Sequence, residues 1–173
     1  SETAVYSMVD FFLLIQIAGA GDELQGIKRG IMEMADGIVI NKADGDNIAE
    51  AQRAAVHYRN ALQLFPMPES GRRPEVLTYS GFYDIGIDGV WKMIYDYVAH
   101  VKDNGVFEER RRRQSKYWMY ESINEQLRNS FFQNELISSR LPLSEDMVLS
   151  GQKTSFVAAK DLLETYFRWM KQG

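Results

Sequence analysis

The sequence contains no cysteine, which excludes disulfides, thiolate metal sites and a cysteine nucleophile. It has no apolar run long enough to cross a bilayer, which needs roughly 20 residues. The longest run, Phe11 to Ile15, ends at Gln16. The amino terminus lacks both the basic start of a secretory signal and an initiator methionine, so we expect a cytoplasmic protein and a chain that is a fragment.

An excess of basic residues is also missing, because the formal net charge is −4. This charge gives no electrostatic reason to expect nucleic acid or an anionic membrane as a partner. The apolar fraction of 45% and the charged fraction of 25% are ordinary for a soluble globular protein. The 173 residues suffice for one sizeable domain, or for a domain with an appendage.

Residues 1–104 alternate short apolar runs with segments of helical periodicity. The expected elements are strands at 11–17, 38–40 and 74–78, with helices at 22–34, 46–65 and 90–101. Such alternation is typical of an α/β fold, in which crossover helices cover a parallel sheet. Ligands bind at the carboxyl ends of parallel strands, so the loops after Ile17, Ile40 and Thr78 are expected to converge on one ligand.

Residues 105–173 show no strand pattern and are predicted to be helical. Glu108 to Arg113 opens a long helical stretch, and a turn is expected near Leu141-Pro142. The final helix is predicted from apolar residues at spacings of three and four. These are Phe156, Ala159, Leu163, Tyr166 and Met170.

The strongest motif is Asn41-Lys42-x-Asp44, which follows a buried strand. Guanine presents an N1–H and an exocyclic amine side by side, and the Asp44 carboxylate can accept a bond from each. Adenine offers neither donor, so it would leave the carboxylate unpaired, which disfavours binding. The apolar stem of Lys42 can lie along the purine face, and Asn41 can tie the loop to neighbouring backbone.

A second element supports the same ligand. The strand that ends at Thr78 leads into Ser80-Gly81, whose backbone N–H groups are expected to meet the guanine O6. Together with Phe82, these residues complete the predicted cofactor-binding set of Asn41, Lys42, Asp44, Ser80, Gly81 and Phe82. The cofactor expected there is GTP or GDP.

Several segments resemble the methylmalonyl-CoA mutase-associated GTPases, whose bacterial members are also called lysine/arginine/ornithine (LAO/AO) transport system ATPases or kinases. The matching segments are 19–30, 41–46, 78–81 and 86–91, and the similarity covers essentially the whole chain. The resemblance implies part of a P-loop-GTPase-like sheet over 1–104 and an α-helical dimerisation region over 105–173.

The resemblance also implies a function. Members of this family are homodimeric GTPase chaperones that guard the loading of adenosylcobalamin onto a mutase of the methylmalonyl-CoA type. The segment from Gly19 to Lys28 matches a mobile switch, in which Asp22, Glu23 and Lys28 are the candidate residues. Glu2 matches the end of another switch.

The sequence departs from the family because the phosphate-binding G-x-x-x-x-G-K-[ST] loop is absent. The ligands for Mg²⁺ are expected upstream of this chain, so no catalytic or metal-binding residue is assigned within it. We therefore predict that these 173 residues alone neither hydrolyse GTP nor bind it tightly.

Other features have simpler interpretations. Arg110 to Arg113 follows two glutamates, which favours a solvated helix face or a partner contact over RNA binding. His57 and His100 lack a second ligand at metal-binding spacing. The aromatic residues Trp118, Tyr120 and Phe131 are interpreted as core or as a dimer interface.

Two alternatives of other classes stay open. The chain can belong to an ATPase or kinase of an amino-acid (LAO/AO) transport system, although Asp44 selects guanine over adenine. It can also be purely a module for dimerisation and partner binding.

Overall fold

The chain divides into two compact units, Ser1–Ser115 and Lys116–Gly173. The computed structural model describes residues 2–17 and 29–171. The predicted boundary between residues 104 and 105, which separates a GTPase part from a dimerisation extension, stays a prediction.

The first unit is an α/β structure, as predicted, with a parallel three-stranded sheet in the order β1-β2-β3. Ile38 of the central strand pairs with Leu14 on one side and with Val76 on the other. Its elements are α1 (Glu2–Tyr6), β1 (Leu13–Ile17), α3 (Arg29–Met34), β2 (Gly37–Asn41), the 3-10 turn η1 (Gly45–Asn47), α4 (Ile48–Gln63), β3 (Glu75–Thr78) and α5 (Ile87–Asp103).

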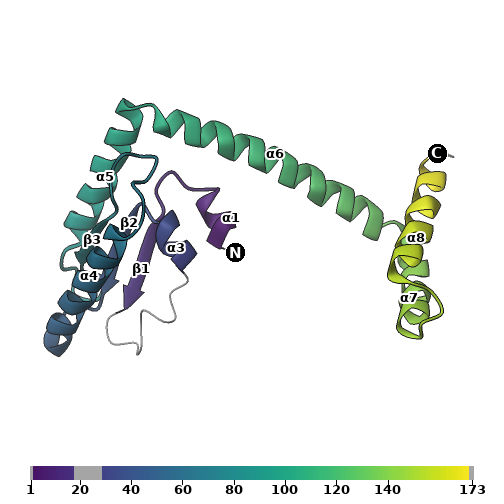
Figure 1. Ribbon diagram of the computed structural model, residues 1–173, viewed down its shortest axis with the longest axis horizontal. Coiled ribbons are helices and arrows are strands. Elements are labelled where there is room, and N and C mark those ends of the chain that lie inside the picture. The colour runs from purple at the N-terminus through teal and green to yellow at the C-terminus, as the bar shows by residue number, and fades with distance from the viewer. Residues whose placement is uncertain (1, 18–28, 172–173) are drawn as a thin grey trace. The chain divides into compact units, whose positions relative to one another are not determined.

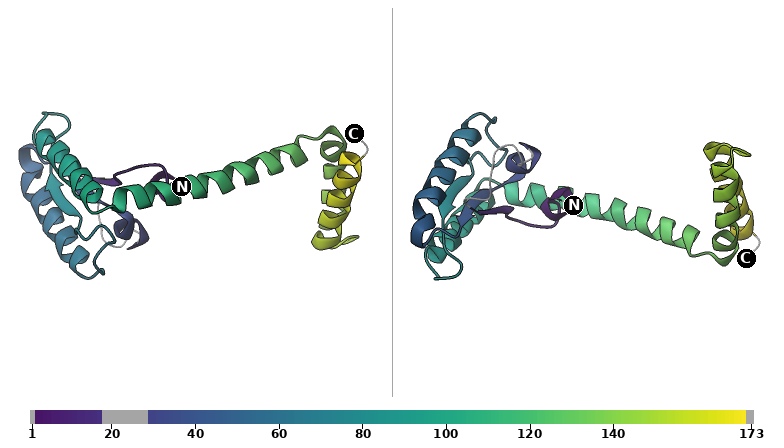
Figure 2. Two further views of the ribbon diagram at one scale, coloured as in Figure 1. Left: turned by 90° about the horizontal axis from the view of Figure 1, so that it is seen from above. Right: turned by 90° about the horizontal axis from the view of Figure 1, so that it is seen from below.

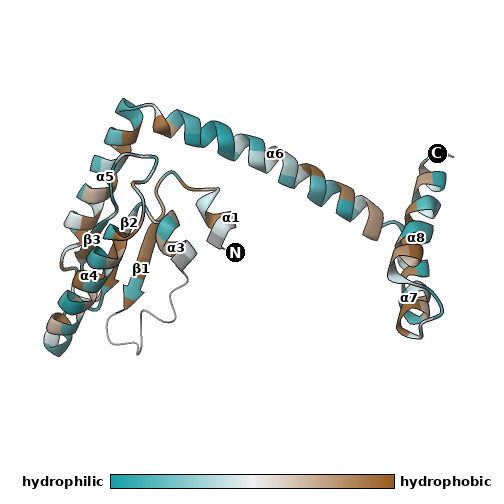
Figure 3. Cartoon of the chain, in the orientation of Figure 1, coloured by the Kyte–Doolittle hydropathy of each residue, from teal (hydrophilic) through white to brown (hydrophobic). Residues whose placement is uncertain are grey.

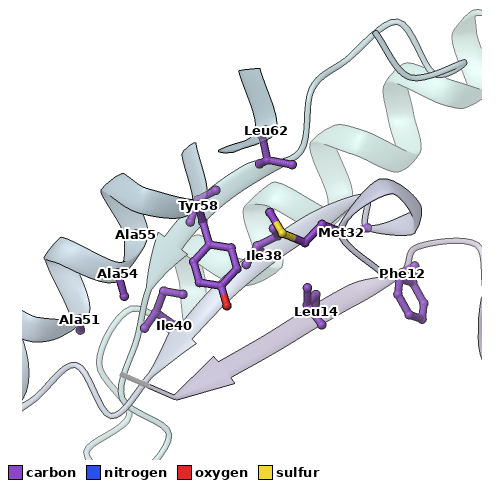
Figure 4. Close-up of a cluster of buried hydrophobic side chains, with 12 residues drawn as sticks. Phe12, Leu14, Met32, Ile38, Ile40, Ala51, Ala54, Ala55, Tyr58 and Leu62 are labelled. Atoms are coloured by element: carbon purple, nitrogen blue, oxygen red, sulfur yellow. The ribbon is translucent and has the colours of Figure 1, made fainter. Parts of the chain in front are cut away.

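Helices cover both faces of the sheet (Figures 1 and 2). One face packs against α3 and α4, whose side chains gather over β1 and β2 in Figure 4. The opposite face packs Val39 against Val90 and Met93 of α5. Ile38, Val39 and Ile40 are consequently almost fully buried, which is why β2 reads as an uninterrupted apolar run.

Three side chains and one backbone N–H meet where β2 begins, at the end opposite to the predicted base site. Arg110 donates to both carboxylate oxygens of Asp36, at 2.7 and 2.9 Å, and Tyr97 donates to the same carboxylate from α5. The backbone N–H of Phe12 donates to it as well, at 2.9 Å. Burial, and then the charge of Asp36, raise the pKa of Tyr97.

The interpretation of Arg110 as part of a solvated face was therefore wrong. Its side chain is only 13% exposed because it is paired with a buried carboxylate 74 residues away in sequence. Arg111, Arg112 and Arg113 do lie on an exposed face, where they pair with Asp10, Glu109 and Glu69, respectively.

Three helices follow the sheet: α6 (Val106–Phe132), α7 (Glu135–Leu149) and α8 (Ser155–Met170). Figure 3 shows that the first half of α6 is strongly hydrophilic, whereas α8 is amphipathic. The turn expected near Leu141-Pro142 does not occur, because α7 continues through Pro142. That helix begins at Glu135 and is capped by Asn134, whose side chain accepts bonds from the N–H groups of Leu136 and Ile137.

Candidate functional site

The candidate base site lies where β2 and β3 end. The pairing of the two segments continues beyond the strands, because Tyr79 N donates to Ile40 O at 2.9 Å and Ala43 N donates to Tyr79 O at 3.0 Å. The loop that carries Asn41-Lys42-x-Asp44 is thus held against the loop that carries Ser80-Gly81. This juxtaposition is the one expected for the carboxyl ends of adjacent parallel strands.

Asn41 fastens the two loops with one oxygen. Its Oδ1 accepts from the N–H of Lys42 at 2.7 Å and from the N–H of Gly81 at 3.1 Å. The tie to neighbouring backbone that the sequence predicted for Asn41 is therefore present. Asn41 thus holds the loop through its own side chain, while the next residue, Lys42, is exposed to solvent.

Asp44 is oriented by Ser80. The Ser80 hydroxyl donates to Asp44 Oδ2 at 2.5 Å and accepts from the N–H of Tyr83 at 3.2 Å. Ser80 is fully buried, whereas Asp44 is only half-buried. None of the described residues donates to Asp44 Oδ1. The carboxylate is therefore fixed through one oxygen and retains acceptor capacity on both.

The backbone donors differ from the prediction. Ser80 N donates to Ile85 O at 2.9 Å and Gly81 N donates to Asn41, so both N–H groups expected to meet the guanine O6 already have protein partners. The next donor along the loop is the N–H of Phe82, which finds no acceptor within residues 2–17 and 29–171. The sequence prediction missed this, because the partners depend on how the loop closes on itself.

Two aromatic rings stand beside this loop. Phe82 is 85% exposed, and its ring meets that of Tyr83 edge-on with centroids 4.9 Å apart. The loop ends at Gly86, which has a φ of 79°. A β-carbon at Gly86 would lie 3.1 Å from the Thr78 carbonyl oxygen, so both conformation and space favour glycine there.

The structure describes the side chain of none of the predicted switch residues. Asp22, Glu23 and Lys28 lie outside the described residues, and Glu2 opens α1 without a described side chain. His100 is tied to structure, since its Nε2 lies 2.8 Å from the Ser70 carbonyl oxygen.

Within 2–17 and 29–171, no three histidine, cysteine, aspartate or glutamate side chains group closely enough to hold an ion. The described helices also include none with the length and apolar content of a membrane span.

A second candidate surface is an apolar groove in the carboxy-terminal unit, which we call the C-terminal groove. It has a volume of about 900 Å³ and lies among α6, α7 and α8. Its walls include Leu127, Phe131, Leu141, Val148, Leu163 and Phe167. Several of these side chains are largely exposed, so the groove offers contiguous apolar surface to solvent.

Comparisons with known proteins agree on one family. Residues 1–136 match the model of the family described as methylmalonyl Co-A mutase-associated GTPase MeaB. The methylmalonic aciduria type A homolog, mitochondrial, of Mus musculus is 39% identical over 166 residues, which are 96% of this chain and 40% of that protein. GTPase ArgK of Escherichia coli is 43% identical over 135 residues, which are 78% of this chain and 41% of that protein.

A solved structure gives the same result for the fold. The crystal structure of an LAO/AO transport system kinase aligns with a TM-score of 0.72 and 34% sequence identity. The alignment covers 95% of this chain and 52% of that one. The chain therefore spans about half the length of the relatives it matches.

Proposed function

The chain belongs to the family of methylmalonyl-CoA mutase-associated GTPases, MeaB, and on that premise we propose that it carries the guanine-recognition part of a GTPase chaperone. The proposed GTPase assists an adenosylcobalamin-dependent mutase of the methylmalonyl-CoA type. One observation supports the choice of nucleotide above all, namely that a half-buried Asp44 carboxylate is oriented by a buried serine at the end of β2 and β3.

The chemistry of this carboxylate fits guanine. A carboxylate has about four lone-pair positions, and the Ser80 hydroxyl occupies one of them. The N1–H and the 2-amino group of guanine would occupy two more in a charge-assisted pair. Adenine would leave a partly desolvated charge without donors, and hence binds less well.

The rest of the loop would enclose the base. The side chains of Lys42 and Phe82 are both exposed. The Lys42 stem would cover one face of the purine, and the Phe82 ring would contact the other face. The Phe82 N–H takes over the role that the sequence assigned to Ser80 and Gly81, and meets the guanine O6.

Phosphate binding and phosphoryl transfer are proposed to depend on residues outside this chain. The sequence has no phosphate-binding loop, and in the family that it resembles the Mg²⁺ ligands are expected upstream of this chain. We therefore assign base recognition to this chain and no step of phosphoryl transfer. When bound elsewhere in the protein, Mg²⁺ would neutralise charge on the transferred phosphoryl group.

Two further roles rest on the family resemblance. The segment from Gly19 to Lys28, with Asp22, Glu23 and Lys28, is proposed to transmit nucleotide state to the mutase, with Glu2 in a neighbouring switch. The C-terminal groove is proposed to bind a second copy of the chain, because an apolar groove of this size is rarely left open in a monomer.

The second candidate is a kinase or ATPase of an amino-acid transport system, and the solved relative is described as an LAO/AO transport system kinase. This candidate requires an adenine nucleotide. Asp44 opposes it for the reason given above, and nothing in the loop favours the adenine edge.

The test replaces the Asp44 carboxylate, which only accepts hydrogen bonds, with an amide that can also donate. In a protein that carries this chain together with a phosphate-binding loop, Asp44→Asn should weaken GDP binding about 100-fold, which corresponds to the loss of two charge-assisted bonds. The same variant should favour the xanthine nucleotide XDP, which offers an acceptor at position 2. Affinities are measured by fluorescence of labelled GDP, XDP and ADP.

The control is Asp46→Asn, which changes an exposed carboxylate of η1 and should leave all three affinities unchanged. A wild-type preference for ADP would exclude the guanine site. GTP hydrolysis is measured in parallel with and without a methylmalonyl-CoA mutase. Acceleration supports the chaperone role, whereas hydrolysis indifferent to the mutase would contradict it.

A further inference from the structure

Lys42 has an unusual backbone conformation for its side chain. Its φ is 61°, in the left-handed region that side chains other than glycine rarely adopt. The conformation is held from both sides of the residue. Asn41 Oδ1 accepts from the Lys42 N–H at 2.7 Å, and Asn47 Nδ2 donates to the Lys42 carbonyl oxygen at 2.8 Å.

Asn47 lies outside the guanine motif and nevertheless contacts two of its residues, Lys42 and Asp44. Its side chain bonds to Lys42, and its backbone N–H donates to the Asp44 carbonyl oxygen at 3.0 Å. The segment from Lys42 to Asp44 is thereby closed into a small ring of hydrogen bonds. Its shape is set by a residue at the start of α4.

We propose that Asn47 is a positioning residue of the base site, which keeps Lys42 in its left-handed conformation so that the lysine stem lies over the purine. This inference rests on the proposed guanine-binding function. Asn47 acts through Lys42 and does not itself touch the base.

Helix capping does not account for the Asn47 side chain. Asn47 occupies the N-cap position of α4, yet its side chain makes no capping hydrogen bond. Its amide is turned back toward Lys42 instead. The contact needs a donor, because the group it meets is a carbonyl oxygen, and aspartate would place a negative acceptor there.

This requirement separates positioning from capping. Aspartate and asparagine are about equally good N-caps, so a capping residue tolerates Asn47→Asp. A positioning residue does not tolerate Asn47→Asp, because a carboxylate cannot donate to the Lys42 carbonyl oxygen. We expect labelled GDP to dissociate about fivefold faster from Asn47→Ala, the effect of one lost hydrogen bond, and at least as fast from Asn47→Asp.

The measurement is stopped-flow displacement of labelled GDP from the protein that carries this chain and a phosphate-binding loop. Asn60→Ala, which alters an exposed asparagine of the same helix, is the matched control and should match the wild type. Circular dichroism checks that each variant is folded.

A double-mutant cycle adds a second criterion. In Lys42→Gly the left-handed conformation carries no strain and there is no stem to orient, so adding Asn47→Ala should change dissociation less than twofold. Equal effects of Asn47→Ala in both backgrounds would overturn the inference, as would an Asn47→Asp variant that holds GDP like the wild type. A wild-type protein that does not prefer GDP to ADP would instead overturn the proposed function.

Discussion

The Asp36 carboxylate is the centre of a buried polar cluster in the first unit. Its carboxylate accepts four hydrogen bonds, one each from Phe12 and Tyr97 and two from Arg110. The side chain is 7% exposed, so these bonds replace water almost completely. Loss of the charge would leave the Arg110 guanidinium uncompensated in a nearly dry environment.

We therefore expect Asp36→Asn to lower the free energy of unfolding by about 3–5 kcal/mol, as when one partner of a buried ion pair is removed. Urea denaturation measures the change. Asp96→Asn, which breaks an exposed pair with Lys92, is the control and should cost less than about 1 kcal/mol. Similar losses in the two variants would show that the Asp36 cluster contributes no more than a surface pair.

The first part of α6 is attached to the sheet unit by charged contacts. Arg111 and Arg113 pair with Asp10 and Glu69, and Gln114 donates to the Val9 carbonyl oxygen at 2.9 Å. The hydrogen bonds from the two arginines hold the pKa of Asp10 and of Glu69 below their ordinary values of 3.8 and 4.5. The attachment of this element is consequently sensitive to acid.

The sign follows from linkage. Because the folded carboxylates have the lower pKa, the unfolded chain binds more protons as the pH falls. The contribution present at pH 7 therefore begins to decrease below about pH 4.5 and is lost as the pH falls through the lowered pKa values of the folded state. The variant Arg111→Gln/Arg113→Gln should be less stable than the wild type at pH 7, and the difference should shrink by pH 3.5. Urea midpoints at both pH values measure this.

Arg112→Gln is the matched control for that element, because its partner Glu109 lies in the same helix. It should change the midpoints little at either pH. A difference between the wild type and the double variant that stays constant with pH would contradict the role of the two carboxylates.

For the whole molecule, the C-terminal groove decides the predicted oligomeric state. Leu163→Glu places a charge within its apolar lining and should convert a dimer into a monomer. Phe156→Glu changes a more exposed side chain of the same helix that is not part of the lining, and should leave the dimer intact. Sedimentation velocity distinguishes these states. A monomeric wild type would contradict the proposal that the C-terminal groove binds a second copy of the chain.

Elements defined by local patterns were predictable. The apolar run of β2 and the periodicity of α4 located both elements, because burial of a strand and of a helix face leaves a direct trace in sequence. The position of Asn41 and Asp44 in one loop at the end of β2 was predictable for a similar reason, whereas their role in base binding stays a prediction. Their spacing after a buried strand expresses the geometry of one short loop.

Features that depend on distant segments were not predictable. The pairing of Asp36 with Arg110 requires that the start of α6 return to the start of β2, which no local pattern encodes. The engagement of the Gly81 N–H by Asn41 arises in the same way, from two loops meeting. Pro142 misled the prediction because the loss of one helix N–H does not outweigh the packing of α7 against α8.

The strand β2 has an evolutionary consequence. Asp36 precedes it and Asn41 ends it, so only the four residues from Gly37 to Ile40 lie between the buried Asp36 carboxylate and the base site. Successive side chains of a strand face opposite sides of the sheet. Adding or deleting one residue between Asp36 and Asn41 would therefore place the buried side chains of β2 on the opposite face, and would displace either Asp36 or Asn41 from its partners. We therefore expect relatives to differ in β2 by substitution and to keep the number of residues between Asp36 and Asn41.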